Sequence, residues 1–86
     1  MNHLATPGFW YWYRQLPEHV RDVADKNFDL LRNNLHHPSL RFKKIGELWT
    51  VRVGRGFRAL AHSREEGMVW FWIGDHAAYE RMLQQE

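Results

Sequence analysis

The spacing of apolar residues changes along the chain at Pro38. Before this proline, apolar residues recur every three or four positions, the spacing of an amphipathic helix. One series follows Thr6-Pro7, a typical helix start, and a second follows Pro17. The first contains Phe9, Trp12, Tyr13 and Leu16, and the second Val20, Val23, Ala24, Asn27, Phe28, Leu31 and Leu35. They predict a short helix and a longer one over 17–34, forming a helical hairpin with an aromatic seam.

After Pro38, apolar and polar residues alternate, which is typical of half-buried strands. The predicted order is a strand over 40–45, a turn at 46–47, a strand over 49–53, a loop at 54–56, a strand from 57, a polar loop over 63–67 and an apolar strand over 68–73. The last run is apolar throughout, as expected for a central strand buried on both faces. Asp75 is then predicted to cap a final helix that starts at His76.

This order of elements predicts an α+β fold. We expect the helical hairpin to pack on a four-stranded antiparallel sheet, followed by a short C-terminal helix. Residues 1–6 are either a frayed end or a short additional strand at the sheet edge. The length of 86 residues fits one domain over 1–86.

The predicted hairpin over 49–61 places two arginines opposite each other. With a three-residue loop at 54–56, Arg52 faces Arg58, on the face that also carries Thr50, Leu60 and His62. The opposite face carries Trp49, Val51, Val53, Phe57, Ala59 and Ala61. Like charges directly opposite destabilise a sheet, so the pair either binds an anion or finds water and carboxylates elsewhere. The pattern alone leaves both interpretations open.

The composition excludes several kinds of catalytic and metal site. The chain has no cysteine, which excludes disulfides, thiolate catalysis and cysteine-based zinc sites. No HxxxH or HExxH spacing occurs, so no metal site and no cofactor are predicted. No apolar run has the ~20 residues of a membrane span, so we expect a soluble, cytoplasmic protein without a membrane partner. The net charge is only +2, but basic residues gather between 41 and 64, which suggests an anionic partner or a solvated basic face.

Several sequence motifs, spread over nearly the whole chain, resemble the RelE/ParE superfamily of type II toxins, and more narrowly its compact ParE-like branch. The matching segments are Phe-Trp-x-x-Tyr-Arg-x-Leu-Pro (9–17), Ala-Asp-Lys-Asn-Phe-x-Leu-Leu (24–31), His-Pro-Ser-Leu-x-Phe-Lys-Lys (37–44), Trp-x-Val-Arg-Val-Gly (49–54), Phe-Arg-Ala-Leu-Ala (57–61) and Trp-Phe-Trp-Ile-Gly-x-His-x-x-Tyr (70–79). The resemblance implies a helical hairpin on an antiparallel sheet, a bacterial cytoplasmic setting and an acidic antitoxin encoded beside the toxin.

The resemblance leaves three functions open. RelE-like members cut mRNA on the ribosome without a metal, so the chain is a candidate mRNA endoribonuclease with ribosome and mRNA as partners. ParE-like members instead poison DNA gyrase and need no nuclease activity. A third alternative is a catalytically degenerate member that only binds its antitoxin.

The resemblance also implies roles for individual residues. Arg58 matches the arginine that stabilises the transition state, and Arg52 the basic residue of the preceding strand. Lys43 and Lys44 match the lysines that hold the phosphate. The group that assists proton transfer falls on His76 or Tyr79. At Thr50, some ribosome-dependent nucleases have a lysine, so this chain lacks that cation.

Two further residues join the candidate substrate site. Arg55 adds a cation at the hairpin loop. If the polar loop keeps register, Trp70 and Trp72 lie on the face of Arg58, where Trp72 could stack on a base; a one-residue slip would bury both tryptophans instead. The aromatic residues over 9–13 are expected to form core, and one of the two adjacent lysines should lie on each sheet face.

Overall fold

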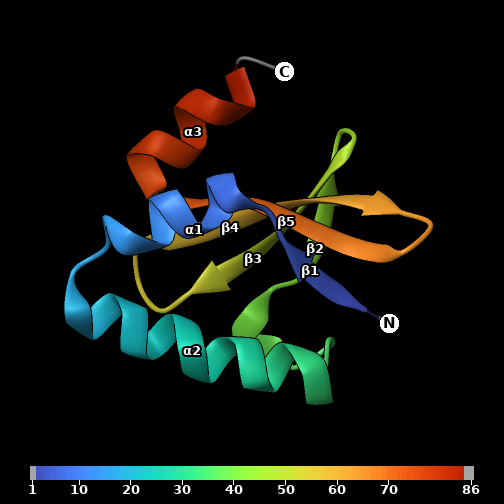
Figure 1. Cartoon of the computed structure of the whole chain (residues 1–86), viewed down its shortest axis with the longest axis horizontal. Coiled ribbons are helices and arrows are strands. Elements are labelled where there is room, and N and C mark those ends of the chain that lie inside the picture. Colours follow the sequence, from blue (N-terminus) through green and yellow to red (C-terminus); the bar gives the residue numbers. More distant parts are fainter. Residues whose placement is uncertain (1, 85–86) are drawn as a thin grey trace.

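Figure 1 shows the computed structural model of the chain, which describes residues 2–84. Its elements, in order, are β1 (His3–Ala5), α1 (Pro7–Arg14), α2 (Glu18–Asn33), the 3₁₀ turn η1 (Pro38–Leu40), β2 (Lys43–Ile45), β3 (Leu48–Val53), β4 (Phe57–Arg64), β5 (Gly67–Asp75) and α3 (His76–Gln84). The predicted α+β fold is confirmed. No helix among these elements is both long and apolar enough to cross a bilayer.

The strands form one five-stranded sheet in the order β1-β5-β4-β3-β2. The strands β2 to β5 make the predicted antiparallel meander. The optional N-terminal strand is present as β1, which pairs parallel with β5 at the sheet edge. The backbone N–H of Thr6 donates to the Trp70 carbonyl at 3.0 Å, which ties the start of α1 to the same strand.

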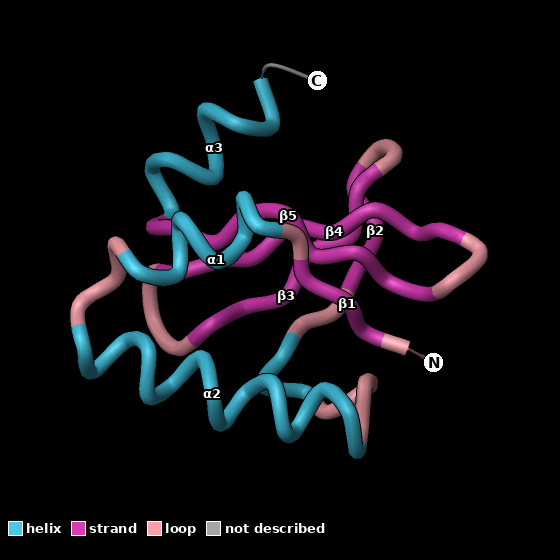
Figure 2. The backbone as a smooth tube through the Cα atoms, in the orientation of Figure 1, coloured by secondary structure: helices cyan, strands magenta, loops and turns pink. Residues whose placement is uncertain are grey.

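The sheet has a separate helical layer on each face. Figures 1 and 2 show α2 and α3 on opposite sides of the strands. Buried residues of the helical hairpin, including Leu16, Val20 and Leu31, form one core with the β3 residues Val51 and Val53. A second, smaller core lies under α3 and contains Leu48, Leu60, Trp72 and Tyr79. Two cores on one small sheet mean that the arginine-bearing face is partly covered by α3.

The helix starts follow from local capping. The Thr6 hydroxyl accepts a hydrogen bond from the Phe9 N–H at 3.1 Å, and Pro7 occupies the first turn of α1, as predicted. Asp75 Oδ1 accepts from the Ala78 N–H at 2.8 Å, which confirms the predicted cap of α3. Pro17 differs slightly from its prediction, because it precedes α2 with an extended ψ of 150° and the helix begins at Glu18.

The prediction that the aromatic residues over 9–13 form core is wrong for three of them. Trp10, Tyr11 and Trp12 are 45%, 52% and 42% exposed. Only Phe9 and Tyr13 pack against the core of the hairpin. The physical reason is that α1 has eight residues and contacts mainly β5, so one face of the helix is enough to cover its neighbour.

The first predicted strand is also shorter than expected. Leu40 lies in η1 and is fully buried in the hairpin core, and Arg41 has a left-handed φ of 47°. A left-handed residue cannot continue a strand, so β2 begins only at Lys43. The alternation of residues 40–45 therefore combines a buried turn with three residues of edge strand.

Candidate functional site

Arg52 on β3 and Arg58 on β4 are direct cross-strand partners. The register agrees with the one predicted from the three-residue loop, in which Gly54 and Gly56 have φ values of 55° and 80°. Both arginine side chains are half-buried. They share the sheet face that carries Leu60 and Trp72, beside α3. Two positive charges therefore lie side by side on a partly shielded surface.

Within residues 2–84, each guanidinium donates to a backbone carbonyl, and that of Arg58 also lies near an aromatic ring. Arg52 Nε donates to the Gly54 carbonyl at 3.1 Å, and Arg58 Nη1 donates to the Phe57 carbonyl at 3.3 Å. The Arg58 guanidinium carbon lies 5.9 Å from the centre of the Tyr79 ring. Within residues 2–84, no carboxylate lies within 4.0 Å of either guanidinium; the salt bridge there joins His76 and Glu80. An arginine has five N–H donors, so most donors of this pair stay available to an anion.

His76 and Tyr79 extend the site along the first turn of α3. Tyr79 lies close to both His76 and Arg58. Its ring centre is 5.6 Å from that of His76 and 5.9 Å from the guanidinium carbon of Arg58. The backbone N–H of His76 donates to the Gly56 carbonyl at 2.8 Å, which fixes the start of α3 on the loop between β3 and β4. The imidazole is half-exposed and pairs with Glu80 at 2.9 Å. Tyr79 itself is only 5% exposed.

The remaining basic candidates lie on the exposed surface around the arginine pair. Lys43 pairs with Thr50, so it lies on the arginine face, whereas Lys44 pairs with Trp49 on the face of the helical hairpin. Both lysines are exposed, as is Arg55 at the tip of the loop. Only one of the adjacent lysines thus shares a face with the arginine pair.

Trp70 and Trp72 do not lie on the same face. The β4–β5 register shifts between Leu60 and Ala61, so that Leu60 pairs with Trp72 and Ala61 with Trp70. This bulge places Trp70 in the hairpin core and Trp72 in the core under α3, with exposed fractions of 4% and 3%. Both tryptophans are buried, as the alternative with a shifted register predicted, but only Trp72 lies on the face of Arg58, where the first arrangement placed both; Trp72 can meet a base only if α3 moves.

Two residues near the arginine pair were not predicted as part of the site. Asn27 of α2 donates from its side-chain amide to the Arg52 carbonyl at 3.3 Å. In the sequence, the residue could have been noticed as an asparagine among the apolar residues of the second helix. Thr50 is 1% exposed, and its hydroxyl has no hydrogen-bond partner among residues 2–84. No three His, Asp or Glu residues of the described chain come together as metal ligands.

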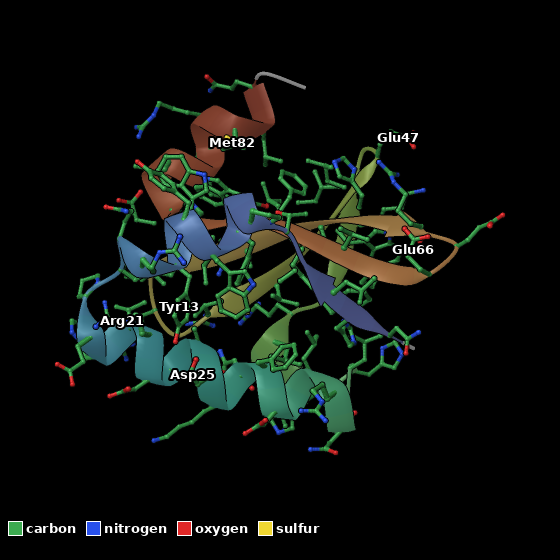
Figure 3. All side chains as sticks on the ribbon, in the orientation of Figure 1. Tyr13, Arg21, Asp25, Glu47, Glu66 and Met82 are labelled. Carbon is green, nitrogen blue, oxygen red and sulfur yellow. The ribbon has the colours of Figure 1, made fainter. Side chains whose placement is uncertain are left out.

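A second surface feature lies on the opposite side of the sheet, between α1, α2 and β1. A cavity of about 330 Å³ opens there, with Trp10, Phe28 and Leu4 at its mouth and Trp70 and Ile73 at its base. The helices are bridged beside it by Tyr13 Oη, which donates to Asp25 Oδ1 at 2.7 Å (Figure 3). That hydrogen bond raises the pKa of Tyr13, because it holds the phenolic proton. We call this cavity the hairpin groove.

Solved structures match this arrangement over nearly the whole chain. The RelB–RelE antitoxin–toxin complex from Methanococcus jannaschii contains a chain that superposes with a TM-score of 0.71 at 16% sequence identity, covering 92% of this chain and 96% of that chain. The isolated E. coli RelE toxin gives a TM-score of 0.62 at 11% identity, covering 96% and 95%. The chain has a RelE-like fold.

A third RelE-like match supports the same conclusion. A free arginine-to-alanine double mutant of E. coli RelE superposes with a TM-score of 0.64 at 11% identity, covering 96% of this chain and 94% of that chain. Searches with the sequence find no matching family model and no matching curated protein. The RelE-like assignment is therefore one of fold, and the activity has to be argued from the residues.

Proposed function

We propose that this chain is the toxin component of a bacterial type II toxin–antitoxin system and that it inhibits translation by cutting mRNA on the ribosome. The observation that carries the proposal is the Arg52–Arg58 pair, which has no carboxylate partner in the described chain and lies on a RelE-like fold. An unneutralised arginine pair on a half-buried surface is suited to a phosphate, because guanidinium groups bind phosphate oxygens in pairs.

The proposed reaction is an attack of an RNA 2′-hydroxyl on the adjacent phosphorus. The 2′-oxygen–phosphorus bond forms, the bond from phosphorus to the 5′-oxygen breaks, and the products are a 2′,3′-cyclic phosphate and a 5′-hydroxyl. Arg52 and Arg58 stabilise the negative charge that grows on the phosphate oxygens. His76 takes the proton from the attacking 2′-hydroxyl and delivers it to the departing 5′-oxygen, which leaves as the 5′-hydroxyl. Tyr79 lies against both His76 and Arg58 and orients them.

A second candidate is the ParE-like mode, in which the chain poisons DNA gyrase without proton transfer. One observation favours it. Trp10, Tyr11 and Trp12 project from α1 with 42–52% exposure, as expected for residues that bind another protein. The buried positions of Tyr79 and Trp72 also limit their use in catalysis.

The partner common to both candidates is an antitoxin. One of the RelE-like matches is the toxin of a RelB–RelE antitoxin–toxin complex. We propose that the antitoxin places apolar side chains in the hairpin groove and acidic side chains on the edge strand β2, which carries Lys43 and Lys44. The groove provides an apolar cavity whose mouth is formed by partly exposed side chains, and such cavities hold the anchor residues of protein partners.

The test compares the wild type with Arg58→Ala in growing bacteria. Protein synthesis, cleavage of a reporter mRNA and the amount of gyrase covalently attached to DNA are followed together. Arg64→Ala is the matched control, because Arg64 lies on the same strand and its Nη1 likewise donates to the preceding carbonyl, at 3.3 Å. Loss of mRNA cleavage in Arg58→Ala alone supports the nuclease.

Other outcomes decide between the alternatives. Gyrase–DNA complexes with intact mRNA select the gyrase poison. Growth that continues normally on expression of a folded wild type rejects both toxic activities.

A further inference from the structure

Helix α2 contacts the β3–β4 hairpin, which carries Arg52 and Arg58, at two positions one helical turn apart. The Asn27 amide donates to the Arg52 carbonyl at 3.3 Å. Val23 lies against Gly54, such that a Cβ added to Gly54 would stand 3.1 Å from Val23 Cγ1. Residues i and i+4 lie on the same face of a helix, so one face of α2 touches both the arginine strand and its loop.

These contacts reach both ends of Arg52. Its backbone carbonyl accepts from Asn27, and its guanidinium Nε donates to the carbonyl of Gly54, the residue that Val23 contacts. On its outer side, β3 pairs with β2 only over residues 48–50. At Arg52, therefore, the contact from outside the β3–β4 hairpin comes from a helix side chain rather than from a neighbouring strand.

The identity of residue 27 is unexpected for a residue that only packs. Its neighbours on the inward stripe of α2 are apolar, and asparagine is a poorer helix former than leucine. Asn33, on the same helix, shows what an asparagine does locally: its amide donates to the Asp29 carbonyl at 2.8 Å, in solvent and within the helix. The Asn27 bond instead spans 25 positions of sequence and ends on the arginine strand.

We propose that Asn27 is a positioning residue for the arginine pair. By holding the Arg52 backbone from α2, it sets how the Arg52 guanidinium stands beside that of Arg58 when the two bind one phosphate. The inference rests on the proposed function, because it requires that this pair binds the RNA backbone. It adds a residue of the opposite sheet face to the machinery of the site.

The test measures binding of the purified chain to a short 2′-O-methyl RNA, which cannot be cleaved at the attacking hydroxyl. Asn27→Leu keeps the size of the side chain and removes the amide. It is expected to weaken binding roughly fivefold, the ratio that corresponds to one net hydrogen bond. Asn33→Leu is the matched control on the same helix and should bind as the wild type does. Asn27→Asp, of the same shape but without the donor, should repeat the loss and replaces Asn27→Leu if that variant does not fold.

A merely structural role is separated by combining Asn27→Leu with Arg52→Ala. If Asn27 acts through Arg52, its substitution has no further effect on binding once the guanidinium is gone. An equal loss in both backgrounds overturns the positioning role. Unchanged binding in Asn27→Leu and Asn27→Asp overturns it as well.

The proposed function fails by a different result. If Arg52→Ala and Arg58→Ala both bind RNA as the wild type does, the phosphate site itself is wrong. If they weaken binding and the Asn27 variants do not, the phosphate site stands and only the positioning role is rejected.

Discussion

The indole of Trp72 lies against Gly74, two residues further along β5. A Cβ added to Gly74 would stand 2.5 Å from Trp72 Cζ2, closer than any side-chain packing allows. Gly74 is also the cross-strand partner of Arg58. The missing side chain therefore lets a buried tryptophan fill the space beside the arginine pair and support α3 above it.

Gly74→Ala is expected to lower the free energy of unfolding by about 1–3 kcal/mol, because the added methyl overpacks the core under α3. The measurement is urea unfolding of the purified chain. Gly8→Ala is the control, since its added Cβ would make only ordinary contacts of 3.6 and 3.7 Å. Gly8 lies within α1, so alanine there should be neutral or slightly stabilising. Equal destabilisation by both variants would contradict the contact with Trp72.

Thr50→Val is expected to raise the free energy of unfolding by about 1 kcal/mol. Valine has the same shape and removes a buried hydroxyl that has no hydrogen-bond partner within residues 2–84. Thr6→Val is the matched comparison. It removes the cap of α1, so it should lower the free energy of unfolding by about 1 kcal/mol. A destabilised Thr50→Val would mean that the hydroxyl has a partner in solution.

The arginine pair could be predicted from the sequence because its geometry is local. A three-residue loop that begins and ends with glycine fixes the register of the two strands, and the register fixes the partners of Arg52 and Arg58. The capping residues Thr6 and Asp75 were predictable for the same reason, since each acts within its own turn.

The rest of the site depends on contacts between distant segments. The bulge at Leu60/Ala61 separates Trp70 from Trp72, and the flanking residues include no glycine to mark it. The contact of Asn27 with Arg52 requires the crossing of α2 over β3, which no helical periodicity specifies. The exposure of Trp10, Tyr11 and Trp12 likewise reflects how little of α1 the sheet edge covers.

The hydrogen bond between Trp70 and His3 predicts that the stability of the fold depends on pH. Trp70 Nε1 donates to His3 Nδ1 at 3.2 Å, which requires an unprotonated nitrogen. Burial, together with the positive charge of Arg32, lowers the pKa of His3 in the folded chain. The unfolded chain therefore binds a proton at His3 more readily than the folded chain does. The contribution of His3 to the free energy of unfolding is complete above the unfolded pKa of about 6.5 and is lost as the pH falls below it.

The measurement is the free energy of unfolding at about pH 7.5 and about pH 5.5. The wild type should lose more stability on acidification than His3→Asn does. His19→Asn, which alters an exposed histidine of α2, should keep the pH dependence of the wild type. Identical pH dependence in all three proteins would show that His3 is not coupled to folding.

Phe28→Glu tests the hairpin groove as the site of the proposed antitoxin. Phe28 is 42% exposed at the mouth of the groove, so a carboxylate there should reduce complex formation at least tenfold without unfolding the chain. The measurement is the affinity for the product of the neighbouring reading frame, purified separately. Lys26→Glu is the control, because it adds the same group to an exposed position of α2 outside the groove. Equal binding by both variants would place the antitoxin elsewhere.

The two adjacent lysines of β2 give a matched test of which face binds RNA. Lys43 pairs with Thr50 on the face of the arginine pair, and Lys44 pairs with Trp49 on the face of the helical hairpin. Both are exposed lysines on the same short strand, so alanine at either position should change stability little. Lys43→Ala should weaken binding to 2′-O-methyl RNA and reduce the salt slope of the binding constant by about one, the effect of one lost phosphate contact. Lys44→Ala should leave that slope unchanged. The reverse result would move the RNA to the other face of the sheet, away from Arg52 and Arg58, and would remove the geometric basis of the proposed cleavage.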